Sequence, residues 1–529
     1  MTKVLITDPI DQSGIDILSQ VAQVDQKIGI SESELATIIK DYDALMIRSG
    51  TQVTEQIINS SKKLRIIGRA GVGVDNVDVK AATQKGVLVV NSPGGNTIAA
   101  AEHTIAMMLA LSRNIPIANS SMFNGKWERK KFVGNELFNK KLGVVGLGKI
   151  GTHVAKVANA MGMEVIGYDP FVSKERAQQL HVKLSELNLL FEESDYVSLH
   201  LPRTTDTENL VDIKLLKSMK NTAKLINCAR GGIIDEDALA EALNNSLIAG
   251  AAIDVFSEEP LNSNSRLLKV QKNNLILTPH LGASTKEAQE NVAVDVAEQI
   301  RDVLLGLSAR TAVNIPGLSP DIMDSLKPHL QLAETLGLLI SQLSGGPIEK
   351  LELKLQGEFV QHPSKPLIIA SLKGLLSKAL GDRINYVNAS IEAETRGINV
   401  IANKDESRPE FASGLLQLTT YGNNGENSVA GSIFADGELR IISIDQYPVN
   451  VSPSRFMLLT RHRDMPGIIG KLGSLLGDHN VNIASMQVGR KIVRGEAVMV
   501  LSIDDPVPAS LLQSILQVEG INSANPVTL

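Results

Sequence analysis

Two blocks of the chain alternate short apolar runs with helical patterns, which is typical of parallel α/β sheets. The apolar runs of the first block are residues 4–7, 44–48, 64–69 and 87–91, and those of the second are 142–145, 164–168, 196–201, 224–227, 248–254 and 275–278. The Ala-, Met- and Leu-rich stretch 97–112 predicts a long buried helix that bridges the blocks. A helix predicted over 284–305 is expected to return to the first block.

The pattern changes after about residue 320, where helices and strands no longer alternate regularly. Helical patterns at 328–343 and 372–380 mix with strand patterns at 348–355, 428–433 and 439–444, which predicts an α+β domain. From residue 455 the order strand, helix, strand, strand, helix, strand predicts a βαββαβ sandwich, and 314–320 has the composition of a linker. The predicted domains are residues 1–97 with 286–315, 98–285, 317–452 and 455–529.

Composition restricts the kind of ligand that the protein binds. A chain of 529 residues exceeds what one core usually fills, and 43% hydrophobic with 21% charged residues is ordinary for a soluble protein. The net charge is −6 and no long basic run is present, which argues against a nucleic-acid partner. We therefore expect small-molecule ligands.

The N-terminus and the single cysteine bear on localisation. The first residues lead directly into a predicted strand without the basic and apolar regions of a signal peptide, and no apolar run approaches the roughly 20 residues that span a bilayer. Cys228 excludes an internal disulfide and is interpreted as a small residue at the end of a buried strand. We expect a cytoplasmic protein with no membrane partner.

A glycine-rich turn between a strand and a helix predicts a dinucleotide site. Gly146 permits the tight turn, Gly148 lets backbone N–H groups approach a pyrophosphate, and Gly151 lets the helix lie close to the strand. The next strand ends in Asp169, whose carboxylate can accept hydrogen bonds from ribose hydroxyls and would repel a 2′-phosphate. The motif thus favours NAD over NADP. The similar run 71–76 lacks the third glycine and is interpreted as a turn.

Residues at the carboxyl ends of the predicted strands are the candidates for chemistry, because ligands of parallel sheets bind there. In the first block Arg48 and Arg69 lie beside the Gly-rich turn 91–97, which together suit an anion. In the second block the strand ends carry the segments 228–232, 254–260 and 278–284.

One arginine, one carboxylate and one histidine at those ends match the needs of alcohol oxidation. Hydride transfer requires a base for the hydroxyl proton and a cation for a neighbouring carboxylate. We predict His280 as the base, Glu259 as the residue that holds its ring, and Arg230 as the clamp. The nine histidines and the single cysteine show no metal-ligand spacing, so no metal is predicted.

The motifs 146–151, 228–232, 254–260 and 279–284 resemble those of the D-isomer-specific 2-hydroxyacid dehydrogenases. Segments 68–78, 91–96 and 126–131 are similar to the long-form members that oxidise 3-phospho-D-glycerate to 3-phosphohydroxypyruvate with NAD, the first step of phosphorylated L-serine biosynthesis. The resemblance covers the whole chain. It implies two doubly wound α/β domains, flavodoxin-like for substrate and Rossmann for NAD, followed by an α+β intervening domain and an ACT domain.

The resemblance also implies roles for individual residues. Arg230, Glu259 and His280 would be catalytic. The expected NAD contacts are Gly146, Gly148, Lys149, Ile150, Gly151, Asp169, Leu201, Cys228, Ala229, Arg230, Asp254, His280, Gly282 and Ala283. The expected substrate contacts are Arg48, Arg69, Asn96, Arg129 and Arg230. Relatives often have Thr at position 201, so only a backbone contact is carried over to Leu201.

The ACT-like segment implies an effector site and a homo-oligomer, a dimer or a tetramer. In the family this site lies between two paired ACT domains and commonly binds serine, so Asp464, beside His462, would hold the amino group. Asn482 of the facing subunit would bind the carboxyl end. An ACT domain that only dimerises is the alternative.

Two other functions remain open. A dehydrogenase or reductase for glycerate, glyoxylate or lactate would use the same catalytic residues but would not need Arg48 and Arg129. An NAD-sensing, corepressor-like binding protein would have a disordered tail in place of two further folded domains.

Overall fold

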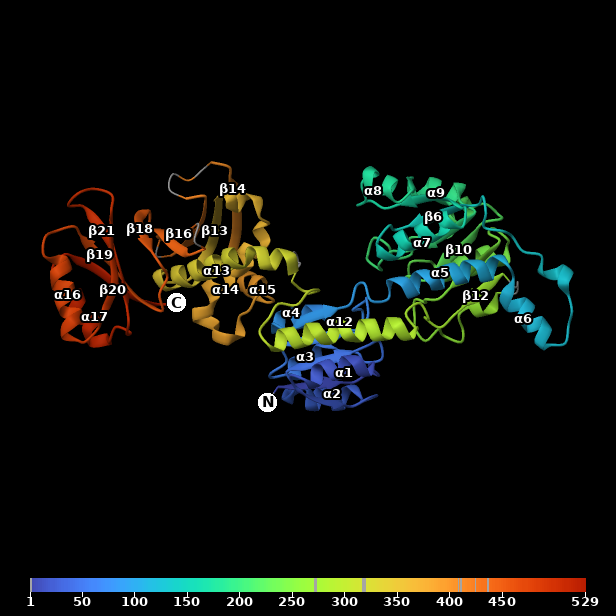
Figure 1. The fold of residues 1–529 in the computed structure, drawn as a ribbon, viewed down its shortest axis with the longest axis horizontal. Coiled ribbons are helices and arrows are strands. Elements are labelled where there is room, and N and C mark those ends of the chain that lie inside the picture. Colours follow the sequence, from blue (N-terminus) through green and yellow to red (C-terminus); the bar gives the residue numbers. More distant parts are fainter. Residues whose placement is uncertain are drawn as a thin grey trace.

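A computed structural model describes residues 2–270, 274–315, 320–407, 409, 412–423, 425–434 and 437–529. Within these residues the strands form sheets of five, seven, six and four strands. Each sheet together with its helices is called below the five-, seven-, six- or four-stranded unit. Figure 1 shows the four units, with the six-stranded unit between the five- and four-stranded units. In the described residues, no helix is long and apolar enough to cross a membrane.

The five-stranded unit has the flavodoxin-like order β2-β1-β3-β4-β5 with all strands parallel, as predicted. Its strands are β1 Lys3–Ile6, β2 Gln23–Gln26, β3 Ala44–Ile47, β4 Ile66–Arg69 and β5 Leu88–Asn91. Its helices are α1 Gln12–Ser19, α2 Glu32–Ile38, α3 Glu55–Ser60 and α4 Val79–Lys85. The returning helix α12 (Lys286–Leu304) buries Val292, Val296 and Ile300 in the core of this unit, which confirms that both ends of the first 315 residues meet there.

The seven-stranded unit is a doubly wound parallel sheet of order β12-β11-β10-β9-β6-β7-β8, the Rossmann arrangement that was predicted. Its strands are β6 Lys141–Val145, β7 Glu164–Tyr168, β8 Lys183–Leu184, β9 Tyr196–Leu199, β10 Lys224–Asn227, β11 Gly250–Ile253 and β12 Leu275–Leu277. Its helices include α5 Thr97–Ser112, α7 Lys149–Ala160, α8 Lys174–Gln179, α9 Leu187–Glu193, α10 Ile213–Ser218 and α11 Glu236–Asn244. The predicted bridging helix is confirmed as α5, which follows β5 and packs against α7 and β11.

The predicted linker 314–320 is wrong at both ends. Asn314 is buried, accepts a hydrogen bond from the Val89 N–H at 2.9 Å and donates to the Val87 carbonyl at 2.9 Å. This residue therefore belongs to the five-stranded unit, since its amide fills hydrogen-bond positions beside β5. At the other end Pro320 begins a helix, and residues 316–319 lie outside the described part of the chain.

The six-stranded unit contains more regular structure than predicted. Its strands are β13 Ile348–Gly357, β14 Asn399–Asp405, β15 Gly414–Gly422, β16 Gly425–Ile433, β17 Leu439–Ile444 and β18 Tyr447–Val451, and its helices are α13 Pro320–Leu343, α14 Ser364–Leu380 and α15 Ala389–Thr395. The helices predicted from residues 328 and 372 begin earlier, because α13 continues through Pro328 and α14 accommodates Pro366 in its first turn. Strands β14, β15 and β18 were not predicted.

The four-stranded unit is the predicted βαββαβ sandwich, with antiparallel order β20-β21-β19-β22. Its elements are β19 Phe456–Arg463, α16 Ile468–Asp478, β20 Ile483–Arg490, β21 Glu496–Ile503, α17 Ala509–Leu516 and β22 Ile521–Thr528. Met457, Leu459 and Val498 are buried in the hydrophobic core of the six-stranded unit. The sheet therefore packs directly against its neighbour.

Candidate active site

A cleft of about 570 Å³ opens between the five- and seven-stranded units, where both present the carboxyl ends of their strands. Its lining includes the predicted residues Arg48, Arg69, Asn96, Arg230, Glu259, His280 and Ala283. The structure therefore brings residues from two separate sheets to one place. The lining also includes Ser49, Gln52, Asp75, Asn76 and Arg203, which the sequence analysis did not select.

His280 and Glu259 form a hydrogen-bonded pair at the edge of the cleft. The Nδ1 atom of His280 lies 2.7 Å from Oε2 of Glu259, whose Oε1 accepts a hydrogen bond from the Phe256 N–H at 3.0 Å. Burial by itself raises the pKa of Glu259, but the hydrogen bonds from His280 and Phe256 outweigh it and leave that pKa below its ordinary value. Because Glu259 is ionised, Nδ1 carries the proton and Nε2 is left with a lone pair that can accept a proton.

Arg230 is held beside this pair by its own loop. Its Nη1 donates to the Ala229 carbonyl at 2.7 Å, and its Nε lies 3.7 Å from Oδ2 of Asp75. A Cβ atom at Gly73 would lie 2.6 Å from Nη2 of Arg230. The run 71–76 is the turn that was predicted, but it also makes room for an active-site arginine, a role that the sequence analysis missed.

Arg69 is a half-buried cation whose surroundings suit an anion. The pKa of Arg69 is lowered to about 10, mainly by burial and also by the neighbouring cations Arg230 and Arg48, while Asp75 opposes them. Among the described residues, neither Nε of Arg69 nor Oδ1 of Asn96 has a hydrogen-bond partner, although both atoms are buried. Buried polar atoms are normally paired, so these atoms are suited to a bound ligand.

The loop that carries Arg48 is fixed by Asp8, a buried carboxylate that follows β1. Oδ2 of Asp8 accepts hydrogen bonds from the backbone N–H groups of Arg48 at 2.6 Å and Thr51 at 3.1 Å. Asn76 donates to the Arg48 carbonyl at 2.7 Å. These contacts join segments far apart in sequence, which is why sequence patterns did not reveal them.

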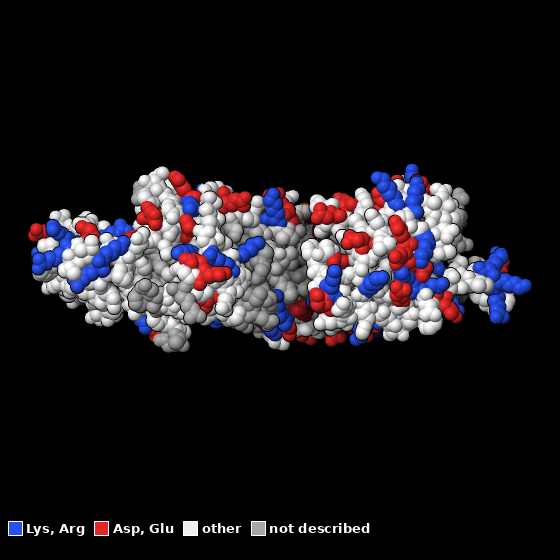
Figure 2. Space-filling model, turned by 90° about the horizontal axis from the view of Figure 1, so that it is seen from above, with Lys and Arg blue, Asp and Glu red and all other residues white. Residues whose placement is uncertain are grey.

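Arg129 does not line the cleft of its own chain, so the structure does not bring it together with the other predicted substrate residues. It begins the short helix η2 (Arg129–Phe132), which follows α6 (Ile115–Phe123) on an arm that projects from the seven-stranded unit. Figure 2 shows basic side chains gathered at the end of this arm. The arm also exposes Phe123, Trp127 and Val133 at 80% or more.

The glycine-rich turn fits a dinucleotide. Gly148 caps α7, and a Cβ atom at this position would meet nothing within 4 Å, so open space lies before the helix N-terminus. A Cβ atom at Gly151 would lie 2.0 Å from the Gly146 carbonyl, so the close approach of helix and strand requires glycine. Asp169 accepts hydrogen bonds from the Leu147 N–H at 2.8 Å and the Phe171 N–H at 2.9 Å, and its oxygens keep further lone pairs for a ribose.

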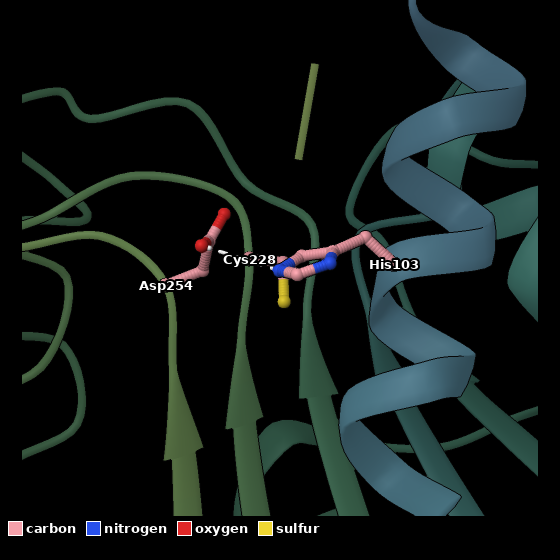
Figure 3. Close-up of side chains that lie close together, drawn as sticks. All are labelled: His103, Cys228 and Asp254. Carbon is pink, nitrogen blue, oxygen red and sulfur yellow. Dashed lines mark ion pairs between the residues drawn. The ribbon is translucent and has the colours of Figure 1, made fainter. Parts of the chain in front are cut away.

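Near the loop that carries His280 lies a cluster of His103, Cys228 and Asp254 (Figure 3). The His nitrogen, the Cys Sγ and the Asp carboxylate oxygen of this cluster are within 4.8 Å of one another. Burial raises the pKa of Cys228 to about 12, so its thiol keeps its proton at neutral pH. His103 lies on α5, Cys228 follows β10 and Asp254 follows β11, and their spacing in the sequence gave no indication of this proximity.

The predicted effector residues do not meet within one chain. Asp464 follows β19 and accepts hydrogen bonds from Arg490 at 2.8 Å and the Arg494 N–H at 3.1 Å. Asn482 precedes β20 and donates to Asp504 at 2.7 Å. The strand register places these two residues at opposite ends of the four-stranded sheet. His462 is buried beside Thr460.

Comparisons with known proteins agree with this geometry. The D-isomer specific 2-hydroxyacid dehydrogenase NAD binding domain matches residues 105–282, the D-3-phosphoglycerate dehydrogenase intervening domain matches 325–445, and the ACT domain matches 456–520. The chain is 61% identical to the D-3-phosphoglycerate dehydrogenase of Synechocystis sp. over 100% of this chain and 95% of that enzyme. It is 43% identical to that of Methanocaldococcus jannaschii over the whole of both chains.

The apo-structure of D-lactate dehydrogenase from Escherichia coli superposes with a TM-score of 0.53 and 27% identity, over 59% of this chain and 100% of that one. The fold and site thus define an NAD-dependent oxidoreductase. The chain belongs to the D-isomer-specific 2-hydroxyacid dehydrogenase family, in its D-3-phosphoglycerate dehydrogenase branch.

Proposed function

We propose that the cleft oxidises the C2 hydroxyl of 3-phospho-D-glycerate to give 3-phosphohydroxypyruvate, with NAD as the hydride acceptor. The observation that carries this proposal is the convergence of Arg48, Arg69 and Arg230 on the His280–Glu259 pair in one cleft. Phosphate and carboxylate together carry about three negative charges, and arginine binds both groups in bidentate fashion.

The geometry assigns a task to each catalytic residue. Nε2 of His280 takes the hydroxyl proton as the C–H hydride leaves and the C=O bond forms, and Glu259 stabilises the resulting imidazolium. Arg230 holds the carboxylate beside the reacting carbon. Bound NAD supplies the acceptor carbon for the hydride. Arg48 and Arg69 are left to bind the phosphate.

Arg129 completes the phosphate site only from a second copy of the chain. The exposed Phe123, Trp127 and Val133 give the arm an apolar surface suited to a partner, and Arg129 lies on the same arm. We therefore infer a homo-oligomer in which each arm reaches the neighbouring cleft.

Subunit mixing tests this arrangement together with the reaction. NADH formation from 3-phosphoglycerate should fall in both Arg129→Ala and His280→Ala. Mixing the two variants should restore activity, because mixed dimers contain one intact site. Arg129→Ala should raise KM for 3-phosphoglycerate much more than KM for glycerate. Equal turnover of glycerate and 3-phosphoglycerate by the wild type would favour a dehydrogenase for an unphosphorylated 2-hydroxy acid. Absence of turnover with either substrate would refute both hypotheses.

The four-stranded unit supports a second, regulatory proposal, namely serine binding between two such units. Asp464 and Asn482 lie at opposite ends of one sheet, so a site that uses both requires two chains. The amino group of serine would have to compete with Arg490 for the Asp464 carboxylate. Equilibrium dialysis with labelled serine tests the proposal, and absence of binding at millimolar serine would refute it.

A further inference from the structure

We propose that His103 is a positioning residue for the dehydrogenase reaction, acting through Asp254 on the backbone of the His280 loop. The proposal rests on the function proposed above and extends it. His103 lies outside the sequence motifs described above.

Asp254 accepts hydrogen bonds from the backbone N–H groups of residues 280–282, the loop that carries His280. It is fully buried after β11, and its carbonyl accepts a hydrogen bond from the His280 N–H at 2.8 Å. Its carboxylate accepts from the Leu281 N–H at 2.8 Å and the Gly282 N–H at 2.9 Å. Three consecutive N–H groups therefore end on one residue. This arrangement supports the left-handed backbone of His280, whose φ is +54°.

His103 sets the position of the Asp254 carboxylate from the far side. Its Nε2 lies 3.2 Å from Oδ1 of Asp254 (Figure 3). The same nitrogen lies 3.4 Å from Oγ1 of Thr278, which itself donates to Oδ1 of Asp254 at 2.5 Å. Burial by itself raises the pKa of Asp254, but the hydrogen bonds from His103 and Thr278 leave it below its ordinary value. The carboxylate is thus an anion with a full set of donors.

The origin of His103 gives this contact a mechanical consequence. Helix α5 begins directly after the Gly-rich turn of the five-stranded unit, with Asn96 of the cleft at its N-cap, and then packs on the seven-stranded sheet. His103 lies two turns along this helix. A displacement of α5 relative to the seven-stranded sheet would therefore move the carboxylate that holds His280.

Metal ligation by the same cluster is the competing interpretation, since histidine, thiolate and carboxylate are zinc ligands. Two observations favour the hydrogen-bonding role. The oxygens of Asp254 already accept from Thr278, Leu281 and Gly282. The Cys228 thiol would have to lose a proton that burial stabilises.

The test compares His103→Gln with His103→Met. Glutamine places an amide N–H near the position of Nε2, whereas methionine has a similar length and no donor. We expect His103→Met to lower kcat about tenfold while KM for 3-phosphoglycerate stays within about twofold, and His103→Gln to recover kcat to within about threefold of the wild type. Glu102→Gln, an exposed neighbour on α5, is the control and should leave both parameters unchanged.

A wild-type kcat in His103→Met, or equal loss in both variants, would overturn the proposal. If His103→Met does not fold, Thr278→Val removes another donor to the same carboxylate, and the same loss confined to kcat is expected. A wild-type kcat in Thr278→Val would then overturn the inference. Failure of the wild type to turn over 3-phosphoglycerate would instead refute the proposed function.

Discussion

The cleft and the four-stranded unit differ in how their functional residues are brought together. Parallel strands all end at one edge, so Arg69 of β4 and His280 after β12 meet although they lie in different sheets. Strands β19 and β20 both run antiparallel to β21 and therefore run in the same direction, so Asp464 after β19 and Asn482 before β20 lie at opposite ends of the sheet. A catalytic site can thus be built largely within one chain, whereas the proposed effector site requires two.

The largest effect is expected from mutation of the proposed catalytic base, and this mutation tests whether the cleft is the catalytic site. His280→Ala should lower kcat about 10²- to 10⁴-fold, because no other group takes the hydroxyl proton. Steady-state NADH formation measures this. Near wild-type turnover would show that the base lies elsewhere.

Arg69→Ala is expected to have the next largest effect. Losing a hydrogen bond to a charged group costs about 1.5–3 kcal/mol, so KM for 3-phosphoglycerate should rise about 10- to 100-fold with a smaller change in kcat. Lys378→Ala, an exposed residue of α14 in the six-stranded unit, is a cation-loss control outside the cleft. An unchanged KM in Arg69→Ala would show that the phosphate does not bind at Arg69.

The convergence of strand ends could be predicted because it depends on local signals and one general rule. Gly146, Gly148 and Gly151 are recognised by spacing, and His280 by its place after a predicted strand. Asp8 and His103 could not be predicted, because their roles depend on contacts with residues 40 and about 150 positions away along the chain. The early start of α13 was missed because Pro328 usually marks a helix boundary.

Subunit mixing tests whether the proposed effector site requires two chains. Asp464→Ala and Asn482→Ala should each abolish serine binding. Mixing equal amounts should restore about a quarter of the sites, since about half of the pairs are mixed and each mixed pair has one of its two sites with both residues. Equilibrium dialysis measures this. Full binding by Asn482→Ala alone would exclude a site that uses both residues.

The pH dependence of the free energy of unfolding should show whether the contacts of Glu259 with His280 and Phe256 stabilise its ionised form in the folded protein. The folded pKa of Glu259 lies below its usual value near 4, so its contribution is fully present above about pH 4 and is lost as the pH falls through the lowered pKa. In urea unfolding between about pH 5 and pH 3, the wild type should lose more stability than Glu259→Gln. Equal losses would contradict the assignment.

The smallest effect is expected at Cys228. Because burial keeps its thiol protonated, iodoacetamide at neutral pH should label the unfolded chain and leave the folded protein essentially unlabelled. Rapid labelling of the folded protein would show that the buried cluster of His103, Cys228 and Asp254 opens to solvent.

A crystal structure with NAD and 3-phospho-D-glycerate tests the central claim most directly. The phosphate should contact Arg48 and Arg69, the carboxylate should contact Arg230, and the C2 hydroxyl should lie within hydrogen-bond distance of Nε2 of His280. A substrate bound with its phosphate at Arg230 and its C2 hydroxyl away from His280 would contradict it.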